Sequence, residues 1–543
     1  MMNCYPGKSV YEGIAFGAAF LLKKSRLTID ESPAKDIRSE WEHYEQAKQL
    51  ADKELELLYQ KTVDEIGEEE AGIMDIQRMI LGDEDFMDMV RDHIMNGNHR
   101  AAHAVSKAGR HFSETFAALD DPYMRTRAQD FIDITQRMLR ILTGSREETE
   151  LSEPSIIVAD DLSPSEIIQL DKSLVRAFVI RHGSANSHAA ILVRTLRIPS
   201  LIQTDIPGDT KLDGLFAAVD AQNGRFYLEP EEQVIKELEL QRNDRIREEA
   251  ELKKLRGLPS LTLDGIKVNL FANIGGPEDM SAVLDNDAEG IGVFRSEFLY
   301  LSRDDYPCED EQFEAYRKVA QGMKGRPVII RTLDIGADKK IPYFDLAPEE
   351  NPALGLRAIR ICFERPEIFE TQLRAIYRAS AYGNVSIMFP MITSLWELRR
   401  CKETAEKVRE ELCGKGVTPG KVPLGIMVET PAAALMAGEL AAEADFFSVG
   451  TNDLTQYTLA VDRQNAKLEH YSDPHHPAVL KFLRMIAESA VRAGITAGIC
   501  GELASDTTLT EQFLQMGYSE LSVSPGFILK IRKKIRSIKA GRK

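Results

Sequence analysis

The sequence predicts a multidomain α/β protein whose C-terminal half is a (β/α)₈ barrel. The main observation is a repeat between Leu263 and Ser524, in which a short apolar run ends in a polar residue and helix-like sequence follows. About eight such runs are present, as this barrel requires. They are Val268–Ile274, Gly290–Phe294, Pro327–Ile330, Val385–Met391, Pro423–Val428, Asp445–Val449, Thr496–Ile499 and Glu520–Val523. The other two observations are a helix-rich segment at 33–147 and strand-rich segments on both sides of it.

The N-terminal half is expected to be an α/β domain that a helical bundle interrupts. Residues 33–147 are rich in Glu, Lys, Gln, Met and Leu and poor in Gly and Pro, which is typical of packed helices. The flanking segments, 1–32 and 148–230, would form one domain. Its candidate strands are Ile14–Leu22, Ile156–Ala159, Ala177–Ile180 and Ala217–Asp220, with a hairpin turn at Asn223-Gly224.

Residues 231–260 are predicted to form a helical linker to the barrel at 261–543. The segment is highly charged, and the pairs Glu232/Lys236 and Glu249/Lys253 have the i,i+4 spacing that supports a solvated helix. A long helical connector suits a domain that must swing between two partners.

Polar residues follow the predicted barrel strands, at the end where such barrels keep their chemistry. They are Arg295, Arg331, Phe389-Pro390, Glu429, Asn452-Asp453 and Cys500, with Arg357 in the excursion after the third strand. A lone arginine there is most often part of a surface salt bridge. If the barrel closes, however, Arg295, Arg331 and Arg357 converge on one mouth and need an anion between them. Guanidinium forks match phosphate and carboxylate oxygens, and Glu429 and Asp453 suit Mg²⁺ rather than zinc. The predicted ligand is a small phosphorylated acid.

A loop of small residues ends in His188, just before an apolar run that could begin a helix. Gly, Ser and Ala allow the backbone to approach a bulky anion, and the first amides of a helix are free donors for phosphate oxygens. A loop histidine is more often solvated or structurally bonded. The barrel residues are what make His188 a candidate reactive imidazole, and its neighbour His182 has no assigned role.

Composition argues against several classes of protein. The net charge of -18 argues against a nucleic-acid partner. The six cysteines include no C-x-x-C pair and indicate reduced thiols, not a disulfide framework or a zinc site. No apolar run approaches the ~18 residues of a membrane span, and Ile14–Leu22 lacks the cleavage site of a signal peptide. We therefore expect a cytoplasmic protein that does not bind membranes.

Long stretches of the chain, in order from Gly13 to about Ile538, match the motifs of one family. The most specific are Phe294–Phe298, Arg331–Gly336, Glu349–Pro352, Met427–Ala433, Gly450–Tyr457 and Cys500–Leu503. In these stretches the chain resembles Enzyme I of the bacterial phosphoenolpyruvate-dependent sugar phosphotransferase system. The resemblance covers nearly the whole sequence.

The resemblance implies a role for each candidate residue. His188 would attack the phosphorus of phosphoenolpyruvate (PEP) as a neutral imidazole, as an unperturbed pKa near ~6.5 allows. Fixed positive charge and positioning supply most of the catalysis in phosphoryl transfer. Cys500 would protonate the enolate carbon to give pyruvate, a role for a thiol of intermediate pKa; the alternative is a small buried apolar residue. The implied substrate contacts are Arg295, Arg331, Arg357, Asn452, Arg463 and Lys339, and the implied Mg²⁺ ligands are Glu429 and Asp453.

The resemblance also implies two protein partners. The inserted bundle would dock HPr, a small carrier that accepts the phosphoryl group on its own histidine, and the barrel would form a homodimer. The predicted dock is an acidic, Met-bearing surface around Met74, Met79 and Glu84, although acidic runs such as Glu68–Glu70 are usually ordinary solvated faces. The resemblance thus implies a PEP-protein phosphotransferase, which catalyses the first step of sugar uptake.

Two departures from the family are visible. Ser184, Ala185 and Asn186 replace the usual Gly, variable residue and Thr before the reactive histidine, which restricts the backbone and changes the reach of the polar side chain. The chain also stops at Lys543 without the extra terminal helix of many members. A closed barrel is compatible with this end, but lower stability or weaker dimerisation is expected.

Two alternative functions stay open. PEP synthase and pyruvate phosphate dikinase share the phosphohistidine and barrel parts, but they need a large ATP-binding domain, and only about 180 residues without a glycine-rich phosphate loop precede His188. A non-catalytic, PEP-binding regulatory homologue is the other alternative. The intact set of Arg295, Arg331, Glu429, Asp453 and Cys500 argues against it.

Overall fold

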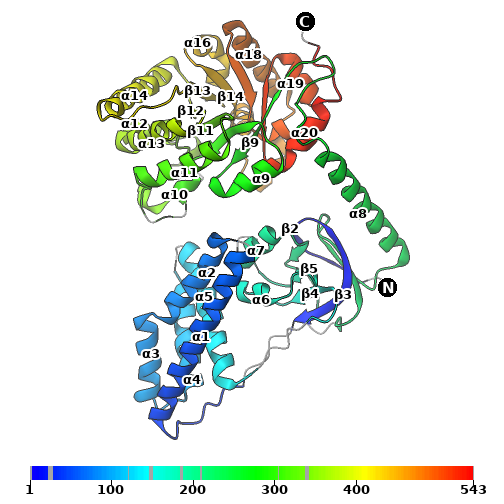
Figure 1. Cartoon of the computed structure of the whole chain (residues 1–543), viewed down its shortest axis with the longest axis vertical. Helices are drawn as coiled ribbons and strands as arrows, with labels where there is room; N and C mark the ends of the chain where they lie inside the picture. Colours follow the sequence, from blue (N-terminus) through cyan, green and yellow to red (C-terminus); the bar gives the residue numbers. More distant parts are fainter. Residues whose placement is uncertain are drawn as a thin grey trace. The chain divides into compact units, whose positions relative to one another are not determined.

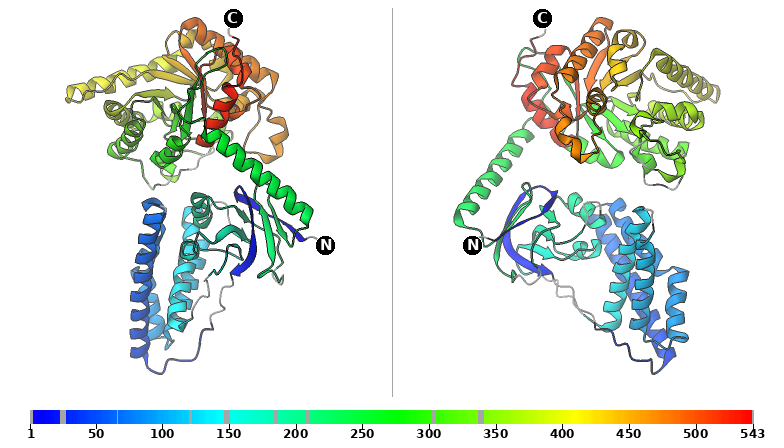
Figure 2. Two further views of the ribbon diagram at one scale, coloured as in Figure 1. Left: turned by 45° about the vertical axis from the view of Figure 1, so that its right-hand side comes forward. Right: turned by 180° about the vertical axis from the view of Figure 1, so that it is seen from behind.

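The computed structural model describes residues 3–22, 28–65, 67–119, 122–145, 151–183, 187–207, 211–301, 303, 305–336 and 341–541. The chain forms two compact units, Met1–Ile246 and Arg247–Lys543. The first combines a sheet with a helical bundle and the second is a closed barrel, so the predicted fold class is confirmed (Figures 1 and 2). None of the described helices is both long and apolar enough to cross a bilayer.

An eight-stranded sheet with the order β1-β8-β7-β3-β4-β5-β6-β2 forms one part of the first unit. The predicted strand Ile14–Leu22 is β3, which pairs parallel to β4 and antiparallel to β7. The predicted turn joins β7 to β8, with Gly224 at a φ of 65°. The remaining strands are β1 (Asn3–Pro6), β2 (Lys8–Tyr11), β4 (Ser155–Ala159), β5 (Val175–Ile180), β6 (Ser200–Ile202), β7 (Phe216–Asp220) and β8 (Arg225–Leu228).

Five helices lie between β3 and β4 in the sequence and form the predicted bundle, drawn in blue to cyan in Figure 1. Tyr44, Ala47, Ala51 and Leu55 recur every three or four residues along α1 and are all buried in its core. Two further helices, α6 and α7, follow strands of the sheet. The seven helices are α1 (Ile37–Glu65), α2 (Glu68–Leu81), α3 (Glu84–Met95), α4 (Ala101–Ala117), α5 (Pro122–Thr143), α6 (Pro164–Gln169) and α7 (His188–Leu196).

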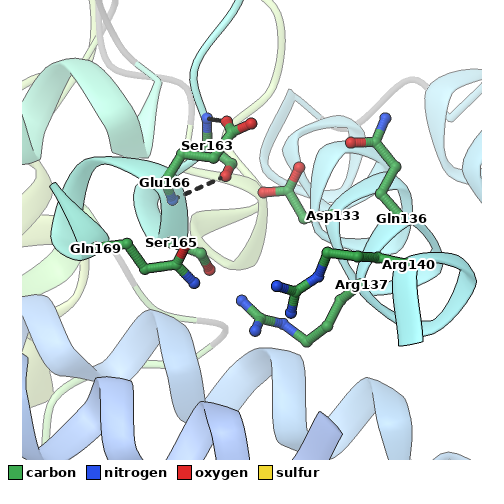
Figure 3. Close-up of a pocket in the computed structure, with 8 residues that line it drawn as sticks. All are labelled: Asp133, Gln136, Arg137, Arg140, Ser163, Ser165, Glu166 and Gln169. Atoms are coloured by element: carbon green, nitrogen blue, oxygen red, sulfur yellow. Dashed lines mark hydrogen bonds between the residues drawn. The ribbon is translucent and has the colours of Figure 1, made fainter. Parts of the chain in front are cut away.

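A small polar cavity of about 40 Å³ lies where the bundle meets the sheet (Figure 3). Arg137 and Arg140 on α5 and Ser163 and Glu166 at the start of α6 line it. Arg137 donates to Glu54 at 2.7 Å, and Ser163 and Glu166 cap α6 reciprocally. A space of this size holds about one water molecule. It is therefore a small polar seam between α5 of the bundle and α6.

The second unit is a parallel barrel in which β16 pairs with β9 and closes the ring. All eight predicted strands are present, and Thr496–Ile499 and Glu520–Val523 have the predicted bounds. The barrel therefore closes with the C-terminal segment as it stands in this sequence, as we expected. The strands are β9 (Asn269–Ile274), β10 (Gly290–Arg295), β11 (Val328–Arg331), β12 (Val385–Phe389), β13 (Leu424–Val428), β14 (Phe446–Val449), β15 (Thr496–Ile499) and β16 (Glu520–Val523).

Helices surround the barrel strands (Figure 1) and bury a large apolar layer against their outer faces. They are α9 (Met280–Asp285), α10 (Phe298–Leu301), α11 (Glu309–Gly322), α12 (Ile359–Glu364), α13 (Pro366–Ala379), α14 (Leu395–Gly414), α15 (Pro431–Leu435), α16 (Ala437–Ala441), α17 (Thr451–Leu459), α18 (Pro477–Ala493), α19 (Thr510–Met516) and α20 (Ile528–Ile535). Between the sheet and the barrel strands in sequence, α8 (Glu232–Lys253) forms over the predicted charged segment, and Lys236 Nζ lies 2.6 Å from Glu232 Oε1.

A fully buried arginine on α20 joins three segments of the barrel unit. Arg532 lies 2.5 Å from Asp287 Oδ2, donates to the Leu255 carbonyl at 3.1 Å and contacts Ser260 Oγ at 3.2 Å. It therefore ties the C-terminal helix to the segment after α8 and to the loop before β10. Removing one partner of a buried ion pair leaves the other uncompensated.

Replacing this arginine is expected to destabilise the barrel unit strongly. Arg532→Met should lower its free energy of unfolding by about 3–5 kcal/mol, because Asp287 loses its counter-charge. Urea denaturation measures the change. Arg536→Met is the matched control. Arg536 donates to the Pro259 carbonyl at 2.7 Å in an exposed position, so its loss should cost about 1 kcal/mol or less. Equal effects of the two variants would contradict the prediction.

Candidate active site

The strand ends place the predicted residues at one end of the barrel. Arg295 and Arg331 are the last residues of β10 and β11 and are paired in register. Glu429 directly follows β13 and Cys500 directly follows β15. Asn452 and Asp453 lie in the first turn of α17, which begins just after β14. In a parallel barrel the carboxyl ends of all strands meet at the same face, so these side chains share one mouth.

Arginines and carboxylates alternate across this mouth. Arg331 lies 2.5 Å from Glu297 Oε1 and 2.8 Å from Asp334 Oδ2. The other oxygen of Asp334 lies 3.0 Å from Arg357, which in turn is 3.1 Å from Asp453 Oδ1. All five side chains are buried. The anion that we expected between the arginines is therefore supplied, in this structure, by the protein's own carboxylates.

The charge balance keeps the buried arginines ionised. Burial disfavours the charge on Arg331, but Glu297 and Asp334 outweigh it and raise its pKa. The pKa of Arg357 is raised in the same way, against burial, by Asp334 and Asp453. These ion pairs hold both guanidinium groups in position. The oxygens of an anionic ligand could take the place of the carboxylates that now pair with them.

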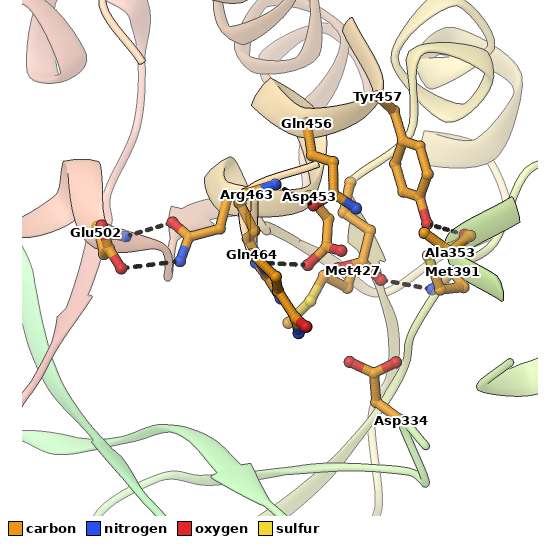
Figure 4. Close-up of polar contacts among 12 residues, drawn as sticks. Asp334, Ala353, Met391, Met427, Asp453, Gln456, Tyr457, Arg463, Gln464 and Glu502 are labelled. Atoms are coloured by element: carbon orange, nitrogen blue, oxygen red, sulfur yellow. Dashed lines mark hydrogen bonds and ion pairs between the residues drawn. The ribbon is translucent and has the colours of Figure 1, made fainter. Parts of the chain in front are cut away.

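A cavity of about 400 Å³ opens beside Arg357. Tyr457 lines it and accepts from Arg357 Nη1 at 3.0 Å. The Tyr457 hydroxyl also donates to the Ala353 carbonyl (Figure 4). Arg463 also lines it and lies 3.4 Å from Asp453 Oδ2. The 349–352 motif contributes Glu350, Asn351 and Pro352 to its wall. This cavity is large enough for a small phosphorylated acid.

Asn452 faces a different partner from the arginines. Its Oδ1 accepts from the Glu502 backbone amide at 3.0 Å, and its Nδ2 donates to Glu502 Oε1 at 3.4 Å (Figure 4). These bonds join the first turn of α17 to the segment after Cys500. The predicted role of Asn452 as a substrate contact stays a prediction.

Glu429 is fully buried and has one unpaired oxygen. Its Oε1 accepts from the Met391 amide at 2.6 Å, whereas Oε2 has no hydrogen-bond partner among the described residues. Burial, with Asp453 and Asp334 adding to it, raises the pKa of Glu429 well above its usual range. No three His, Cys, Asp or Glu side chains of the described chain are grouped to hold a metal by themselves. Two carboxylates with an orphaned oxygen fit Mg²⁺, which keeps water or substrate oxygens as its other ligands.

Mg²⁺ affinity is therefore expected to rise with pH between pH 6 and 8. At the lower pH Glu429 holds a proton, which the metal must displace, so affinity should fall by up to about tenfold per pH unit as the pH is lowered. Calorimetric titration at several pH values measures this. In Glu429→Gln both the affinity and its pH dependence should drop. An affinity for Mg²⁺ that is constant from pH 6 to 8 would contradict the prediction.

Cys500 is buried, and its thiol points to the end of β14. Its Sγ donates to the Val449 carbonyl at 3.3 Å. Burial raises the pKa of the Cys500 thiol to about 12, so the expected intermediate pKa is wrong: the low-dielectric interior disfavours the thiolate. Asn273 donates to the Cys500 carbonyl at 3.1 Å and holds this segment to β9. The thiol therefore stays protonated at neutral pH.

Several predicted residues lie wholly or partly outside the described residues. Lys339 and the altered loop residues Ser184, Ala185 and Asn186 are among them, as is the side chain of His188. The backbone of His188 begins α7, where the Ser187 hydroxyl accepts from the Ala190 amide at 3.2 Å. The helix that we expected just after His188 is present and begins at His188 itself.

The prediction that Met74 belongs to a docking surface on the bundle is wrong. Met74 is completely buried in the core that the bundle shares with the sheet, because it lies on the inner face of α2. Met79, on the same helix, is 74% exposed, and Glu84 is exposed at the start of α3. The side chains of Glu68–Glu70 lie outside the described residues.

Glu297, Asp334 and Tyr457 are site residues that the sequence reasoning missed. All three lie inside the motif stretches Phe294–Phe298, Arg331–Gly336 and Gly450–Tyr457. An acidic residue two or three positions from a strand-end arginine was the available signal, since a buried arginine needs a counter-charge.

Three family models match the chain. They describe the PEP-binding domain, the N-terminal part and the mobile domain of PEP-utilising enzymes, over residues 249–540, 6–127 and 151–224. The phosphoenolpyruvate-protein phosphotransferases of Priestia megaterium and Bacillus subtilis are 38% and 39% identical to this chain over 98% and 97% of its length, and each match covers 93% of the relative. The phosphoenolpyruvate-protein phosphotransferase of Staphylococcus carnosus is 40% identical, and the match covers 98% of this chain and 93% of the relative. The chain therefore belongs to the phosphoenolpyruvate-protein phosphotransferase family of PEP-utilising enzymes.

Proposed function

We propose that this protein transfers the phosphoryl group of PEP to His188 and then to a histidine of HPr, releasing pyruvate, as the first step of phosphotransferase-system sugar uptake. The observation that supports this most is the barrel mouth, where Arg331 and Arg357 are buried and held ionised by carboxylates, and where Arg357 lines a cavity of about 400 Å³. A phosphorylated carboxylic acid is the ligand whose oxygens match those forks.

Substrate binding exchanges the partners of the arginines. Asp334 bridges Arg331 and Arg357, so an incoming phosphoryl or carboxylate group competes with a carboxylate for each guanidinium fork. Arg295 adds an exposed cation at the end of the neighbouring strand, and Arg463, Asn452 and Lys339 are proposed as further contacts. Mg²⁺, when held by Glu429 and Asp453, would offset negative charge on the substrate oxygens.

The transfer requires one proton and one nucleophile. A ring nitrogen of His188 forms a bond to phosphorus, and the bond from phosphorus to the enolate oxygen breaks. The enolate carbon then takes the proton of the Cys500 thiol, which gives pyruvate and leaves a thiolate. The raised pKa of Cys500 ensures that the proton is present at neutral pH. The same burial makes the thiol a weaker acid, so the basic enolate carbon has to draw the proton away, and the buried thiolate that is left is readily reprotonated afterwards.

The proposal divides the chain by task. Residues 1–32 and 148–230 carry His188, residues 33–147 dock HPr, residues 231–260 connect, and residues 261–543 bind PEP. The exposed Met79 and Glu84 support a dock on the bundle, and the acidic balance of the chain suits a basic carrier. We place the protein in the cytoplasm as a homodimer formed through the barrel. Light scattering of the purified protein tests the dimer.

Labelled PEP tests the function directly. With Mg²⁺, the purified protein should acquire phosphate that is labile in acid and stable in base, and adding HPr should remove it. Label from ATP instead would favour a dikinase, and label from neither donor would favour a regulatory homologue. Omitting Mg²⁺ and adding a chelator is the control for the metal.

A further inference from the structure

A glutamine outside the mouth connects the two strands that carry its phosphate-binding arginines. Gln372 lies on α13, in the helical layer around the barrel, and is completely buried. Its neighbours on the same helix face, Phe369, Leu373 and Ile376, belong to the apolar core. A polar residue at such a position has to satisfy every hydrogen bond that it can make, since unpaired buried groups are costly.

The carboxamide of Gln372 bridges the segments that continue from β10 and β11. Its Oε1 accepts from the Leu333 amide at 2.8 Å, and its Nε2 donates to Ser296 Oγ at 3.0 Å. Because a backbone N–H can only donate, the Leu333 contact fixes which end of the carboxamide is the oxygen. Ser296 directly follows Arg295, and Leu333 lies two residues after Arg331.

These contacts begin where the sheet ladder stops. Arg295 and Arg331 are the last paired residues of β10 and β11. Beyond them, one planar carboxamide joins the Leu333 backbone amide to the Ser296 side-chain hydroxyl by two short hydrogen bonds, beside the ion pair of Arg331 with Glu297. Side chains at a strand end keep their direction only if the backbone there is held.

A second set of buried groups orients the glutamine itself. Gln372 Nε2 also donates to the Tyr316 hydroxyl at 3.1 Å, and that hydroxyl donates to Gln312 Oε1 at 3.3 Å. Gln312 is buried as well and donates to the Pro307 carbonyl at 3.0 Å. Gln372 thus uses its acceptor and both donor directions, which leaves it a single orientation.

We propose that Gln372 is a positioning residue that sets the spacing and direction of Arg295 and Arg331 for the phosphoryl group of PEP. The inference rests on the proposed role of these arginines in PEP binding. Gln372 touches no substrate. It acts by fixing two strand ends, so its loss should change how well the arginines bind the phosphoryl group as its charge redistributes.

Gln372→Met and Gln312→Met test the proposal as a matched pair. Both remove a fully buried carboxamide of the same cluster and keep the side-chain length, but only the first breaks the bridge between Ser296 and Leu333. The two variants should lower the urea midpoint by similar amounts. Gln372→Met should weaken PEP binding, measured by calorimetry, and lower the rate of His188 phosphorylation at least about tenfold, whereas Gln312→Met leaves the bridge itself in place and should have a clearly smaller effect on both.

Transfer from the phosphorylated protein to HPr provides a readout that the barrel mouth does not control. It should proceed at the wild-type rate in both variants. Equal losses of PEP affinity in the two variants, or unchanged affinity in Gln372→Met, would overturn the proposal. If wild-type protein binds PEP but takes no label from it, the proposed function fails, and the calorimetric comparison still decides the role of Gln372.

Discussion

Replacing His188 with alanine is expected to abolish phosphorylation by PEP completely. The imidazole is the proposed nucleophile, and no other group at the start of α7 can form a phosphoramidate. The alanine should not disturb the helix, because Ser187 supplies the cap and alanine is the best helix former. The measurement is the stoichiometry of acid-labile phosphate after incubation with labelled PEP and Mg²⁺.

His182 provides a matched control for this variant. It lies six residues earlier in the chain, two residues after the end of β5, and is exposed. His182→Ala should keep full labelling, and PEP binding to His188→Ala should be unchanged, because the barrel supplies that binding. Label that persists in His188→Ala, or that disappears in His182→Ala, would show that another histidine carries the phosphoryl group.

Substituting Arg331 with lysine is expected to lower kcat/KM for PEP by about 100-fold or more. Lysine keeps the charge but loses the planar fork, so it cannot hold Glu297 and Asp334 at once and then present two donors to phosphate oxygens. One of these buried carboxylates loses a partner, which should reduce the free energy of unfolding by about 1–3 kcal/mol. Steady-state kinetics and urea denaturation measure the two effects.

Arg326→Lys separates the effect of the site from that of arginine chemistry in general. Arg326 precedes the other end of β11 and donates to the Ala288 carbonyl at 2.7 Å. It should leave kcat/KM within about a factor of two. A wild-type kcat/KM in Arg331→Lys would mean that a single positive charge at this position is enough for catalysis. It would contradict the prediction that the two donors of the guanidinium group are needed.

Local patterns predicted the barrel strands well. Runs such as Thr496–Ile499 and Glu520–Val523 match in both bounds because burial on two faces leaves a short continuous apolar segment between polar residues. Other boundaries shifted by one or two residues. Val385–Met391 ends two residues early, at Phe389, where the chain leaves the sheet and Met391 takes a positive φ of 56°.

Contacts between distant residues were not predictable in the same way. Glu297 and Asp334 are ordinary acidic residues in the sequence. Only the closed barrel shows that Glu297 pairs with Arg331 and that Asp334 lies between Arg331 and Arg357. Met74 and Met79 differ by five positions, yet one is in the core and the other on the surface. When both residues are apolar, their spacing along a helix does not tell which of the two faces the core and which faces solvent.

The sequence by itself determined the order of strands and helices, the barrel, and the identity of the residues that end its strands, because these follow from local periodicity and from motifs of adjacent residues. Only the tertiary structure decided the electrostatic state of the site. Burial raises the pKa of Cys500 to about 12, and the pairing of Asp334 with two arginines keeps them ionised. Both effects depend on dielectric environment and distance between residues far apart in the chain, which the order of amino acids does not state.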